Sequence, residues 1–322
     1  MAQEIAAAYL RQVVACEQSG SPLYAEVCRK LATAPALVDV VDGDVGHHPI
    51  RVLGALHRLS LLTGIDPWRD PVATVIDHHD EVERLVATQR VQTNEVQRAW
   101  ALLPAFLSLG AERLDLLELG PSAGLNLVWD RYRYRYAAGA WGDPQAPLEL
   151  CGDERRPIPA TLLGRTVEVV RRRGVDLEPV DATTDDGRLM LRSFVWADQT
   201  DRLDRLDRAL GALAHDPPQL IPGDYVDLLP SLLDDRIDGS LLVVFQTAST
   251  QYLTPERYAV LRETLASVSR PVGWVSTRNH LDPGGKLEGG YELEAGLLPR
   301  PPKIVAHMGY HGQWLEWFGE GA

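Results

Sequence analysis

The chain has 322 residues, of which 45% are hydrophobic and 24% charged, and this composition is typical of a globular protein with a large core. Its 32 basic and 45 acidic residues give a net charge of −13, so the composition does not favour a surface that holds a phosphate backbone. We therefore expect no nucleic-acid partner.

The cysteine content indicates a reducing compartment. Cys16, Cys28 and Cys151 form no CxxC pair and leave an odd thiol, which argues against a disulfide framework. The first residues, MAQEIAAAYLRQVV, resemble an amphipathic helix rather than a secretory signal, and no apolar run approaches the roughly 18 residues of a membrane span. We therefore expect a cytoplasmic protein without membrane contact.

Helical patterns fill the chain up to about residue 110. Apolar residues recur at helical spacing over 2–18, 23–33 and 50–62, and 78–108 is predicted as one long helix with a kink at Pro104. These patterns predict an all-helical N-terminal domain, a helical cap, over residues 1–110.

Strands and helices alternate from residue 111 onward. The run LDLLELG predicts a strand that ends in a glycine turn, with a helix from Ala123. Further strands are predicted over 218–224, 240–248, 270–276 and 303–311, and helices over 201–214 and 255–268. This alternation is typical of an α/β fold with an open, mainly parallel sheet whose ligand site lies beyond the carboxyl ends of the strands. We expect a core over 111–322, with 137–197 as an insertion around the second strand.

Arginine and tyrosine alternate over residues 130–136. On a strand this alternation places Tyr132, Tyr134 and Tyr136 on one face and the arginines on the other. Basic residues between aromatics can bind single-stranded nucleic acid, but the net charge disfavours that interpretation. A half-buried strand with its tyrosines in the core is the prediction.

The turn Gly120-Pro121-Ser122-Ala123-Gly124 permits close approach of the backbone to a ligand. A dinucleotide site needs GxGxxG, and Ser122 stands where the second glycine belongs, which disfavours a nicotinamide cofactor. The same residues satisfy GxSxG, and Asp224 and His311 follow in the chain order of a serine hydrolase triad. No HGG-like oxyanion sequence precedes the turn, which argues against this alternative.

Three segments resemble the class I S-adenosylmethionine-dependent methyltransferases in the right order. LDLLELGPSAG resembles their first motif, an apolar strand with an acid before a GxGxG loop, except that Ser122 replaces the middle glycine. LIPGDYVDLLP resembles their third strand, and LVVFQTASTQYLTPERYAVLRETLASVSRPVGWVS resembles the stretch from strand 4 to strand 5. The resemblance implies a Rossmann-like, methyltransferase-type open sheet that binds S-adenosylmethionine.

The same resemblance implies roles for individual residues. Glu118 would contact the cationic methionine portion and Asp224 the adenine, while Asp176, chosen over Asp181 and Asp198, would bind the ribose hydroxyls. The remaining implied cofactor contacts are the loop residues and the end of the fourth strand: Gly120, Ser122, Gly124, Asn126 and Gln246. Tyr252, just after that strand, occupies a place where such enzymes often contact the substrate.

Nearly the whole chain also resembles an uncharacterised bacterial family, domain of unknown function 2332. The segments that carry this resemblance are SPLYAEVCRKLA, QTNEVQRAWALLPAF, LLELGPSAGLNLVWDRYRY and HGQWLEW. The family implies no activity, only a methyltransferase-like core with a helical cap.

Several other polar residues are candidates for chemistry. Asn94 and Glu95 belong to a polar group in which Arg90, Asn94 and Arg98 would share one helix face, and they could bind substrate if that helix covered the site. A solvated helix face explains the same residues without a function. His311 near a strand end is the candidate general base. The run Asp-His-His-Asp at 77–80 has no metal-ligand spacing, so no metal is assigned.

The leading hypothesis is a small-molecule methyltransferase in which positioning supplies most of the rate and His311 removes a proton. One alternative keeps the scaffold and performs elimination or cyclisation without methyl transfer, which Ser122 in the loop motivates. The others are the serine hydrolase with Ser122, Asp224 and His311, and a non-catalytic protein that acts through a partner interface. The sequence does not specify an oligomeric state.

Overall fold

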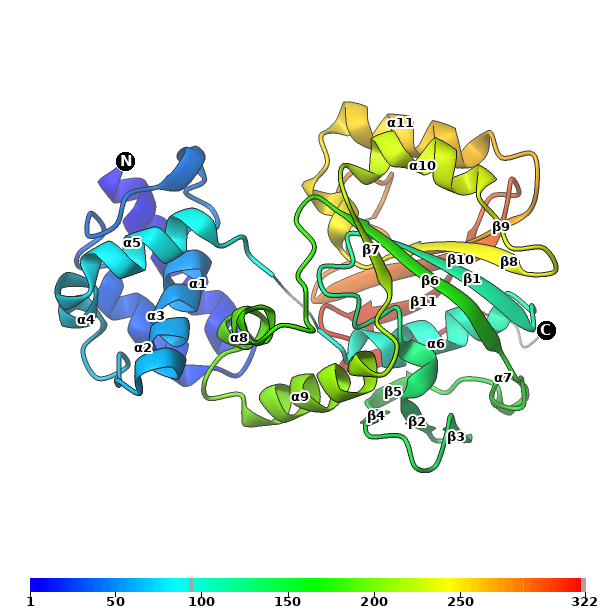
Figure 1. The fold of residues 1–322 in the computed structure, drawn as a ribbon, viewed down its shortest axis with the longest axis horizontal. Helices are drawn as coiled ribbons and strands as arrows, with labels where there is room; N and C mark the ends of the chain where they lie inside the picture. Colours follow the sequence, from blue (N-terminus) through cyan, green and yellow to red (C-terminus); the bar gives the residue numbers. More distant parts are fainter. Residues whose placement is uncertain (93–94, 286, 320–322) are drawn as a thin grey trace. The chain divides into compact units, whose positions relative to one another are not determined.

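The computed structural model describes residues 1–92, 95–285 and 287–319 (Figure 1). The chain divides into two compact units, the first formed by residues 1–93 and 181–206 and the second by residues 94–180 and 207–322. The first unit therefore includes a segment, 181–206, from much later in the chain. The predicted N-terminal domain was instead one continuous range, residues 1–110. In the described ranges, no helix is both long and apolar enough to cross a membrane.

Helices make up the first unit. Ser21 caps one of them, because its side chain accepts a hydrogen bond from the Tyr24 amide and Pro22 follows it at the first helical position. The unit contains α1 (Ala2–Gln18), α2 (Pro22–Leu31), η1 (Val41–Gly43), α3 (His48–Thr63), α4 (Pro71–Asp77), α5 (His79–Thr88), α8 (Asp185–Ser193) and the first part of α9 (Thr200–Ala214).

The segment 181–206 completes the core of the first unit. Trp196 lies against Tyr24 of α2 with a ring-centroid distance of 4.5 Å. Gly54 of α3 packs so closely on Phe194 that a Cβ at Gly54 would lie 2.9 Å from the ring. The Ser21 hydroxyl donates to Asp198 Oδ1 over 2.8 Å. These contacts come from residues that are distant in sequence, so sequence periodicity alone did not predict them.

The prediction of one helix over 78–108 is wrong. Helix α5 ends at Thr88, residues 89–92 are not helical, and α6 (Arg98–Ser108) begins only at Arg98. Thr88 and Val91 are β-branched and weaken helix propagation here. Arg90 and Arg98 therefore do not share a helix face, and α6 belongs to the second unit.

Pro104 lies inside α6 without ending it. Proline has no N–H, so the carbonyl of Trp100, four residues earlier, loses its helical donor. The hydroxyl of Tyr136 donates to that carbonyl instead. The ring of Tyr136 also stacks on Trp100, with 5.2 Å between the centroids. A side chain from another element thus replaces the missing backbone hydrogen bond.

A nine-stranded sheet forms the centre of the second unit, with the order β5-β12-β11-β10-β9-β8-β1-β6-β7. Five neighbouring strands, β7, β6, β1, β8 and β9, are parallel. β10, β11 and β12 continue the sheet by antiparallel pairing, and β5 pairs parallel with β12. The bounds are β1 (Arg113–Leu119), β5 (Asp153–Arg156), β6 (Glu168–Asp176), β7 (Gln219–Pro222), β8 (Leu241–Gln246), β9 (Val272–Thr277), β10 (Gly290–Leu298), β11 (Lys303–Gly309) and β12 (Trp314–Trp317). The prediction of a mixed α/β protein with a large, mostly parallel sheet is confirmed.

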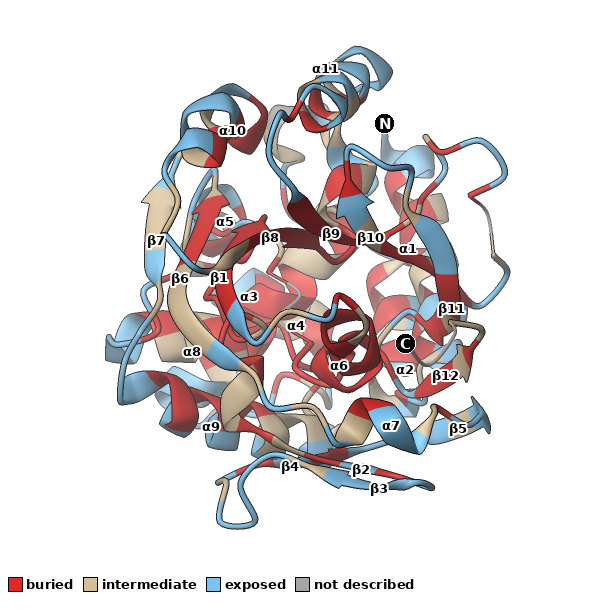
Figure 2. Ribbon diagram, turned by 90° about the vertical axis from the view of Figure 1, so that its right-hand side faces the viewer, coloured by how far each residue is buried: buried red, intermediate tan, exposed pale blue. Residues whose placement is uncertain are grey.

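Helices pack on both faces of this sheet. On one face, α10 (Tyr225–Asp234) and α11 (Pro255–Ala266) cover Leu117, Leu119 and Val244 (Figure 1). Side chains alternate along a strand, so Phe245 points to the opposite face, where its ring meets Phe106 of α6 at 5.1 Å. Figure 2 shows α6, β8 and β9 as largely buried. By the same alternation, Glu118 points to the α6 side of β1.

The connection from β1 to β6 differs from the prediction. Residues 122–128 form turns that lead into η2 (Trp129–Arg131), so the helix predicted from Ala123 is wrong. Gly124 has a φ of +78°, which interrupts a helix, and the Tyr132 hydroxyl donates to the Leu125 carbonyl over 2.7 Å. A second sheet follows with the order β3-β2-β4, from β2 (Arg133–Tyr136), β3 (Gly139–Trp141) and β4 (Glu149–Cys151), and then α7 (Ala160–Leu163).

The tyrosine face predicted over 130–136 is confirmed. Tyr132, Tyr134 and Tyr136 are all buried, the last two on β2. The range 137–197 contains β3 and β4 of the small sheet, β5 and β6 of the central sheet, and α8 of the first unit. The range predicted as one insertion therefore contributes to the small sheet, to the central sheet and to the first unit.

Candidate functional site

The parallel strands have the order 3-2-1-4-5, counted along the chain as β1, β6, β7, β8 and β9. In open α/β sheets with this order, ligands bind outside the carboxyl ends of the strands where the order reverses. Here that switch point lies between β1 and β8, whose register pairs Glu118 with Phe245. The turn after β1 is fixed there by two hydrogen bonds, from Gly120 N to Val175 O at 2.8 Å and from Ser249 Oγ to Leu119 O at 2.6 Å.

Backbone strain is concentrated at this edge. Among the described residues, the non-glycine residues with a left-handed backbone are Ser122, with a φ of +53°, and Ala248, with a φ of +64°. The Ser122 amide donates to Asp176 Oδ2 at 2.9 Å, and the Ala248 amide donates to Thr277 Oγ1 at 2.8 Å. Such conformations cost about 1–3 kcal/mol each and are enriched at functional sites. The strain therefore favours a functional role for the ends of β1 and β8.

The glycines of the turn are already required by packing within the chain. A Cβ on Gly120 would lie 2.5 Å from Ser249 Cβ, and one on Gly124 would lie 2.6 Å from Pro218 Cγ. A Cβ on Gly174 of β6 would lie 2.5 Å from Pro121 Cγ, although Gly174 has no left-handed φ. The glycine pattern by itself therefore gives little support for a ligand.

Glu118 is the stronger indication of a ligand. Its side chain is 2% exposed at the end of β1, and its Oε2 has no hydrogen-bond partner. Asn126 donates a hydrogen bond to this carboxyl group, and Asn126 Oδ1 is likewise buried without a partner. Two hydrogen-bonded side chains, eight positions apart in the sequence, thus each keep a buried oxygen without a donor.

The electrostatic environment of Glu118 opposes its ionisation. Burial raises the pKa of Glu118 well above its usual value, and the nearby negative charge of Asp176 raises it further. The positive charge of Arg98 and the hydrogen bond from Asn126 lower the pKa in the opposite direction, but they are the smaller effects. A positively charged ligand would relieve the unfavourable charge of the ionised carboxylate.

Asp176 closes the carboxyl end of β6 beside the turn. Its Oδ2 accepts from the Ser122 amide, and its Oδ1 accepts from the Glu178 amide at 3.0 Å. Its backbone carbonyl accepts from Gly223 N at 2.8 Å. A carboxylate offers about four lone-pair positions, so each oxygen can still accept a further hydrogen bond. Asp176 therefore joins the ends of three strands and keeps capacity for a ligand.

Asp224 follows β7 and caps α10. Its Oδ1 accepts from Val226 N at 2.8 Å, and its Oδ2 pairs with Arg257 at 2.6 Å. The neighbouring Tyr225 is buried, and its hydroxyl lies 3.5 Å from the Ser249 carbonyl, close to the turn after β1. The carboxylate of Asp224 thus has a helix-capping role that its sequence position did not reveal.

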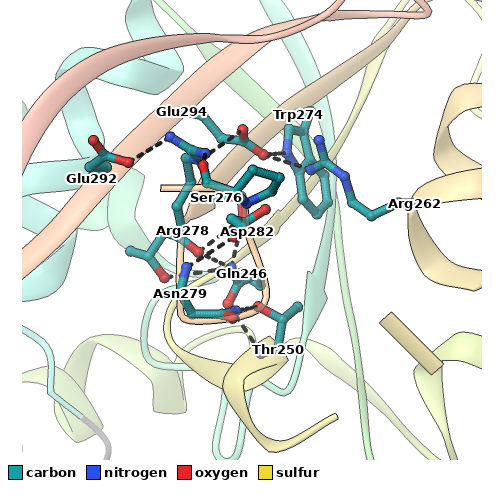
Figure 3. A network of polar contacts seen from close by, with 12 residues as sticks. Gln246, Thr250, Arg262, Trp274, Ser276, Arg278, Asn279, Asp282, Glu292 and Glu294 are labelled. Atoms are coloured by element: carbon teal, nitrogen blue, oxygen red, sulfur yellow. Dashed lines mark hydrogen bonds and ion pairs between the residues drawn. The ribbon is translucent and has the colours of Figure 1, made fainter. Parts of the chain in front are cut away.

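Gln246 is the last residue of β8 and is fully buried (Figure 3). Its Nε2 donates to Ser276 Oγ and to Thr277 O, both at 2.7 Å, while its Oε1 accepts from Ser249 N at 3.0 Å. Its amide is bonded at both ends within the chain, which gives Gln246 a positioning role for the strained Ala248.

The polar contacts in Figure 3 continue toward β9 and β10. Asn279 Nδ2 donates to Thr250 Oγ1 at 2.8 Å, which fixes the loop after β8 to the loop after β9. Glu294 accepts from Trp274 Nε1 at 2.6 Å and from Arg262 at 2.8 Å. This network fixes the edge of the sheet without leaving acceptor atoms comparable to those at Glu118.

The remaining predicted residues lie at different places along the same edge. Glu95 is buried, and its Oε1 accepts from Gln97 N at 3.1 Å in the turn before α6. Tyr252 ends η3 (Ser249–Tyr252) and is 65% exposed, and His311 lies in the turn between β11 and β12. Asn94 lies outside the described residues.

The serine hydrolase arrangement does not form. Ser122, Asp224 and His311 follow β1, β7 and β11, and β7 is six places from β11 in the sheet. Adjacent strands lie about 4.8 Å apart, so Asp224 and His311 are separated by about 29 Å along the sheet edge. The ion pair with Arg257 also removes Asp224 from such a triad.

The predicted site omits two residues around Arg98: Arg98 itself, whose charge acts on Glu118, and Tyr291, on which the same charge acts. Arg98, the first residue of α6, is 7% exposed, and its Nε donates to the Tyr310 carbonyl at 2.9 Å. Tyr291 at the start of β10 faces Tyr310 with 4.9 Å between ring centroids, and the charge of Arg98 acts on it. Arg98 stood out in sequence only as one member of a polar run, and Tyr291 only by its place after two glycines.

The fold and the site place the chain among mixed α/β proteins with a large, mostly parallel sheet and polar residues at its switch point. Residues 6–317 match the family described as "Uncharacterized protein conserved in bacteria (DUF2332)", and the chain belongs to this family. A comparison with curated proteins finds no match.

Proposed function

We propose that the protein is an S-adenosylmethionine-dependent methyltransferase that acts on a small molecule. The observation that carries the proposal is the buried Glu118 carboxyl at the switch point, whose Oε2 has no donor and which a cationic ligand would complement. The order of the five parallel strands supports it, because this order is the one that binds nucleotides across the switch point.

The residues present fit this cofactor. Glu118 and Asn126 offer acceptors to its ammonium group, and Asp176 offers acceptors to the ribose hydroxyls. The turn from Gly120 to Gly124 lines the ligand between them, and the start of α10 at Asp224 lies on the adenine side. When bound, the cofactor supplies an electrophilic methyl group on a sulfonium.

The chain itself would contribute binding and orientation. Glu118 and Asp176 hold the cofactor from two adjacent strands, and Tyr252 after β8 contacts the substrate. His311 lies in the turn after β11, next to Tyr310, whose carbonyl accepts from Arg98, so it would remove a proton from a substrate that reaches this turn. Holding the reactants in line supplies most of the rate in this proposal.

A second candidate is a related enzyme that binds the same cofactor without transferring its methyl group, such as one for elimination or cyclisation. Ser122 motivates it, because a side chain with a left-handed backbone stands where the first motif of methyltransferases has glycine. Incubation with methyl-labelled cofactor and candidate substrates distinguishes the two, since only the methyltransferase moves the label.

The decisive experiment is calorimetric titration of the full chain with S-adenosylmethionine. We expect micromolar binding, and Glu118→Gln should weaken it about 10- to 100-fold because a charge-assisted contact is lost. The matched control is Glu168→Gln at the opposite end of the parallel strands, which should bind like the wild type. Absence of binding at millimolar ligand would refute the proposal.

A fluorophosphonate probe gives a complementary result. Ser122 has no triad in the structure, so we expect no labelling of Ser122. Covalent labelling that is lost in Ser122→Ala would favour the hydrolase instead.

A further inference from the structure

Three tyrosines that the fold leaves unburied lie at one edge of the central sheet. The chain has ten tyrosines, all in the described ranges, and only Tyr252, Tyr291 and Tyr310 among them are not buried. Tyr252 is 65% exposed and Tyr310 is 43% exposed, although a tyrosine ring is large and gains much from burial. Exposed rings that are confined to one place indicate a contact surface rather than scattered surface residues.

The register of the sheet places these tyrosines at the edge where ligands bind. Tyr291 comes two residues before Leu293, which pairs with Thr277, the last residue of β9. β11 runs antiparallel to β10 and ends beside its start, and Tyr310 directly follows β11. Tyr252 ends η3, which follows β8. All three therefore lie at the carboxyl ends of the parallel strands, where open α/β sheets bind their ligands.

Contacts join these residues into a tyrosine cluster, formed by Tyr252, Tyr291 and Tyr310. The rings of Tyr291 and Tyr310 meet edge to face, with 4.9 Å between the centroids and 78° between the planes. The Tyr310 hydroxyl donates to the Leu287 carbonyl at 3.4 Å, and the Gln251 amide donates to the Tyr291 hydroxyl. Because Gln251 precedes Tyr252 in η3, this hydrogen bond brings the loop after β8 to Tyr291. The chain thus holds two of the hydroxyls and leaves ring surface exposed.

The tyrosine cluster lies on the side of the sheet to which Glu118 points. Glu294 accepts a hydrogen bond from α11, and side chains alternate along β10, so Tyr291 points to the opposite side, which α6 covers. Arg98 at the start of α6 donates to the Tyr310 carbonyl at 2.9 Å, and its charge acts on both Tyr291 and Glu118. The cluster therefore adjoins the candidate site at the end of β1.

We propose that Tyr252, Tyr291 and Tyr310 bind a planar aromatic ring of a small molecule. The inference rests on the proposed function in that this ring belongs to the molecule that accepts the methyl group. Aromatic rings favour offset-stacked and edge-to-face contacts, with roughly 4.5–7 Å between their centroids. Tyr291 and Tyr310 already form one such contact, and a ligand ring extends it. A saturated ring of the same size offers apolar surface but no contact of this kind.

Two other occupants fit the surroundings less well. Tyrosine rings also attract cations, but the buried Arg98 places a positive charge beside the cluster, which opposes a cationic ligand. Tyrosine is also enriched in protein interfaces. The position of the cluster at the carboxyl ends of the parallel strands favours a small molecule over a protein partner.

The test compares two matched probes on the full chain by ligand-observed NMR titration, without cofactor. Phenylpropanoate and cyclohexylpropanoate have the same charge and the same chain, and only the first has a planar aromatic ring. We expect phenylpropanoate to bind more tightly, although the cyclohexyl compound is the more hydrophobic. Tyr252→Leu and Tyr310→Leu should each weaken phenylpropanoate about 2- to 10-fold, as for a lost aromatic pair, and leave cyclohexylpropanoate nearly unchanged.

Leu297→Ala is the matched control, because Leu297 is an exposed apolar residue of the same strand as Tyr291 but lies near its other end. It should change neither affinity. Tyr310→Phe keeps the ring and removes the hydroxyl, so it should bind phenylpropanoate like the wild type. If Tyr310→Leu fails to fold, Tyr252→Leu makes the same comparison at the most exposed of the three rings.

Several results would overturn the inference. Equal affinity of the wild type for the two probes, binding of neither probe, or tyrosine variants that weaken both probes equally would each do so. Tighter binding of choline than of phenylpropanoate would indicate a cation site instead. A change of oligomeric state in Tyr252→Leu with unchanged probe affinities, measured by analytical ultracentrifugation, would identify a protein interface.

The outcomes separate the inference from the proposed function, because calorimetry with S-adenosylmethionine is an independent measurement. If the chain binds S-adenosylmethionine but does not prefer phenylpropanoate, the inference is overturned and the proposed function stands. If phenylpropanoate binds in a tyrosine-dependent manner but S-adenosylmethionine does not bind, the aromatic site stands and the proposed function is overturned. Binding of neither ligand overturns both.

Discussion

Glu118 gives the folded protein a specific pH dependence. An unfolded glutamate ionises near pH 4.3, whereas burial raises the pKa of Glu118 in the fold. Between these two values the unfolded state has released the proton that the folded state retains, so stability falls as the pH rises. Glu118→Gln should remove this component and be more stable than the wild type at pH 8, by about 1–3 kcal/mol, but not at pH 4.

Chemical denaturation of both proteins from pH 4 to pH 9 measures the difference. Glu168→Gln again serves as the control, because Glu168 is exposed and its ion pair with Arg113 lies on the surface, where such pairs contribute little to stability. Parallel profiles for wild type and Glu118→Gln would contradict the prediction.

The sequence could locate Glu118 because it stands at the end of a strand that an apolar run defines. Asp176 came only from the methyltransferase resemblance, because three arginines interrupt the apolar pattern of β6. The sequence could not place Arg98 or show that Asn126 meets Glu118, because these contacts depend on how α6 and the turns after β1 pack. Asp224 illustrates a further limit. Its position after a strand suggested a ligand contact, and only the structure shows the helix cap and the ion pair with Arg257.

At the level of elements, α6 depends on a hydrogen bond from outside the helix. Tyr136→Phe should cost about 1–3 kcal/mol, because the buried Trp100 carbonyl loses its donor while the ring stacking remains. In Pro104→Ala the restored amide can donate to the same carbonyl, so Tyr136→Phe should cost less in that background. The two substitutions are therefore coupled.

A double-mutant cycle by urea denaturation measures this coupling. Tyr132→Phe is the control, because the Tyr132 hydroxyl donates to Leu125, away from α6, and Pro104→Ala should not change its cost. Additive effects of Pro104→Ala and Tyr136→Phe would show that Tyr136 does not compensate for the proline.

Strand prediction succeeded where an apolar run marks the strand, both in the buried β8 and β9 and in the partly exposed edge strand β7. Four predicted strands, over 218–224, 240–248, 270–276 and 303–311, correspond to β7, β8, β9 and β11, which contain apolar runs. β10 escaped prediction because Glu292 and Glu294 interrupt its pattern, and their partners, Arg278 and Arg262, become evident only in the fold. The helix after Gly124 failed for a related reason, since the hydroxyls of Tyr132 and Tyr134 donate to the carbonyls of Leu125 and Trp129.

At the scale of the whole molecule, the chain crosses between its two units more than once. Trp196→Ala should destabilise the first unit by about 3 kcal/mol, because it removes a ring packed against Tyr24 in that core. Hydrogen exchange should then quicken in α2 and α3 while β1 and β8 keep their protection.

Trp129→Ala provides the converse change in the second unit, where Trp129 is fully buried and stacks on Phe106. It should quicken exchange in α6 and leave α2 and α3 protected. If either variant affected all of these elements equally, the two units would unfold as one, which the separate cores do not predict.

The contact between Gly174 and Pro121 constrains how related sequences can diverge. Because the backbone of Gly174 is not left-handed, a side chain is excluded by lack of space: a Cβ would lie 2.5 Å from Pro121 Cγ and 3.1 Å from Leu127 Cδ1. Positions 121 and 174 should therefore covary, with alanine at 174 accompanied by a smaller residue at 121. An alignment of family members in which alanine at 174 coexists freely with proline at 121 would show that β6 can move away from the turn.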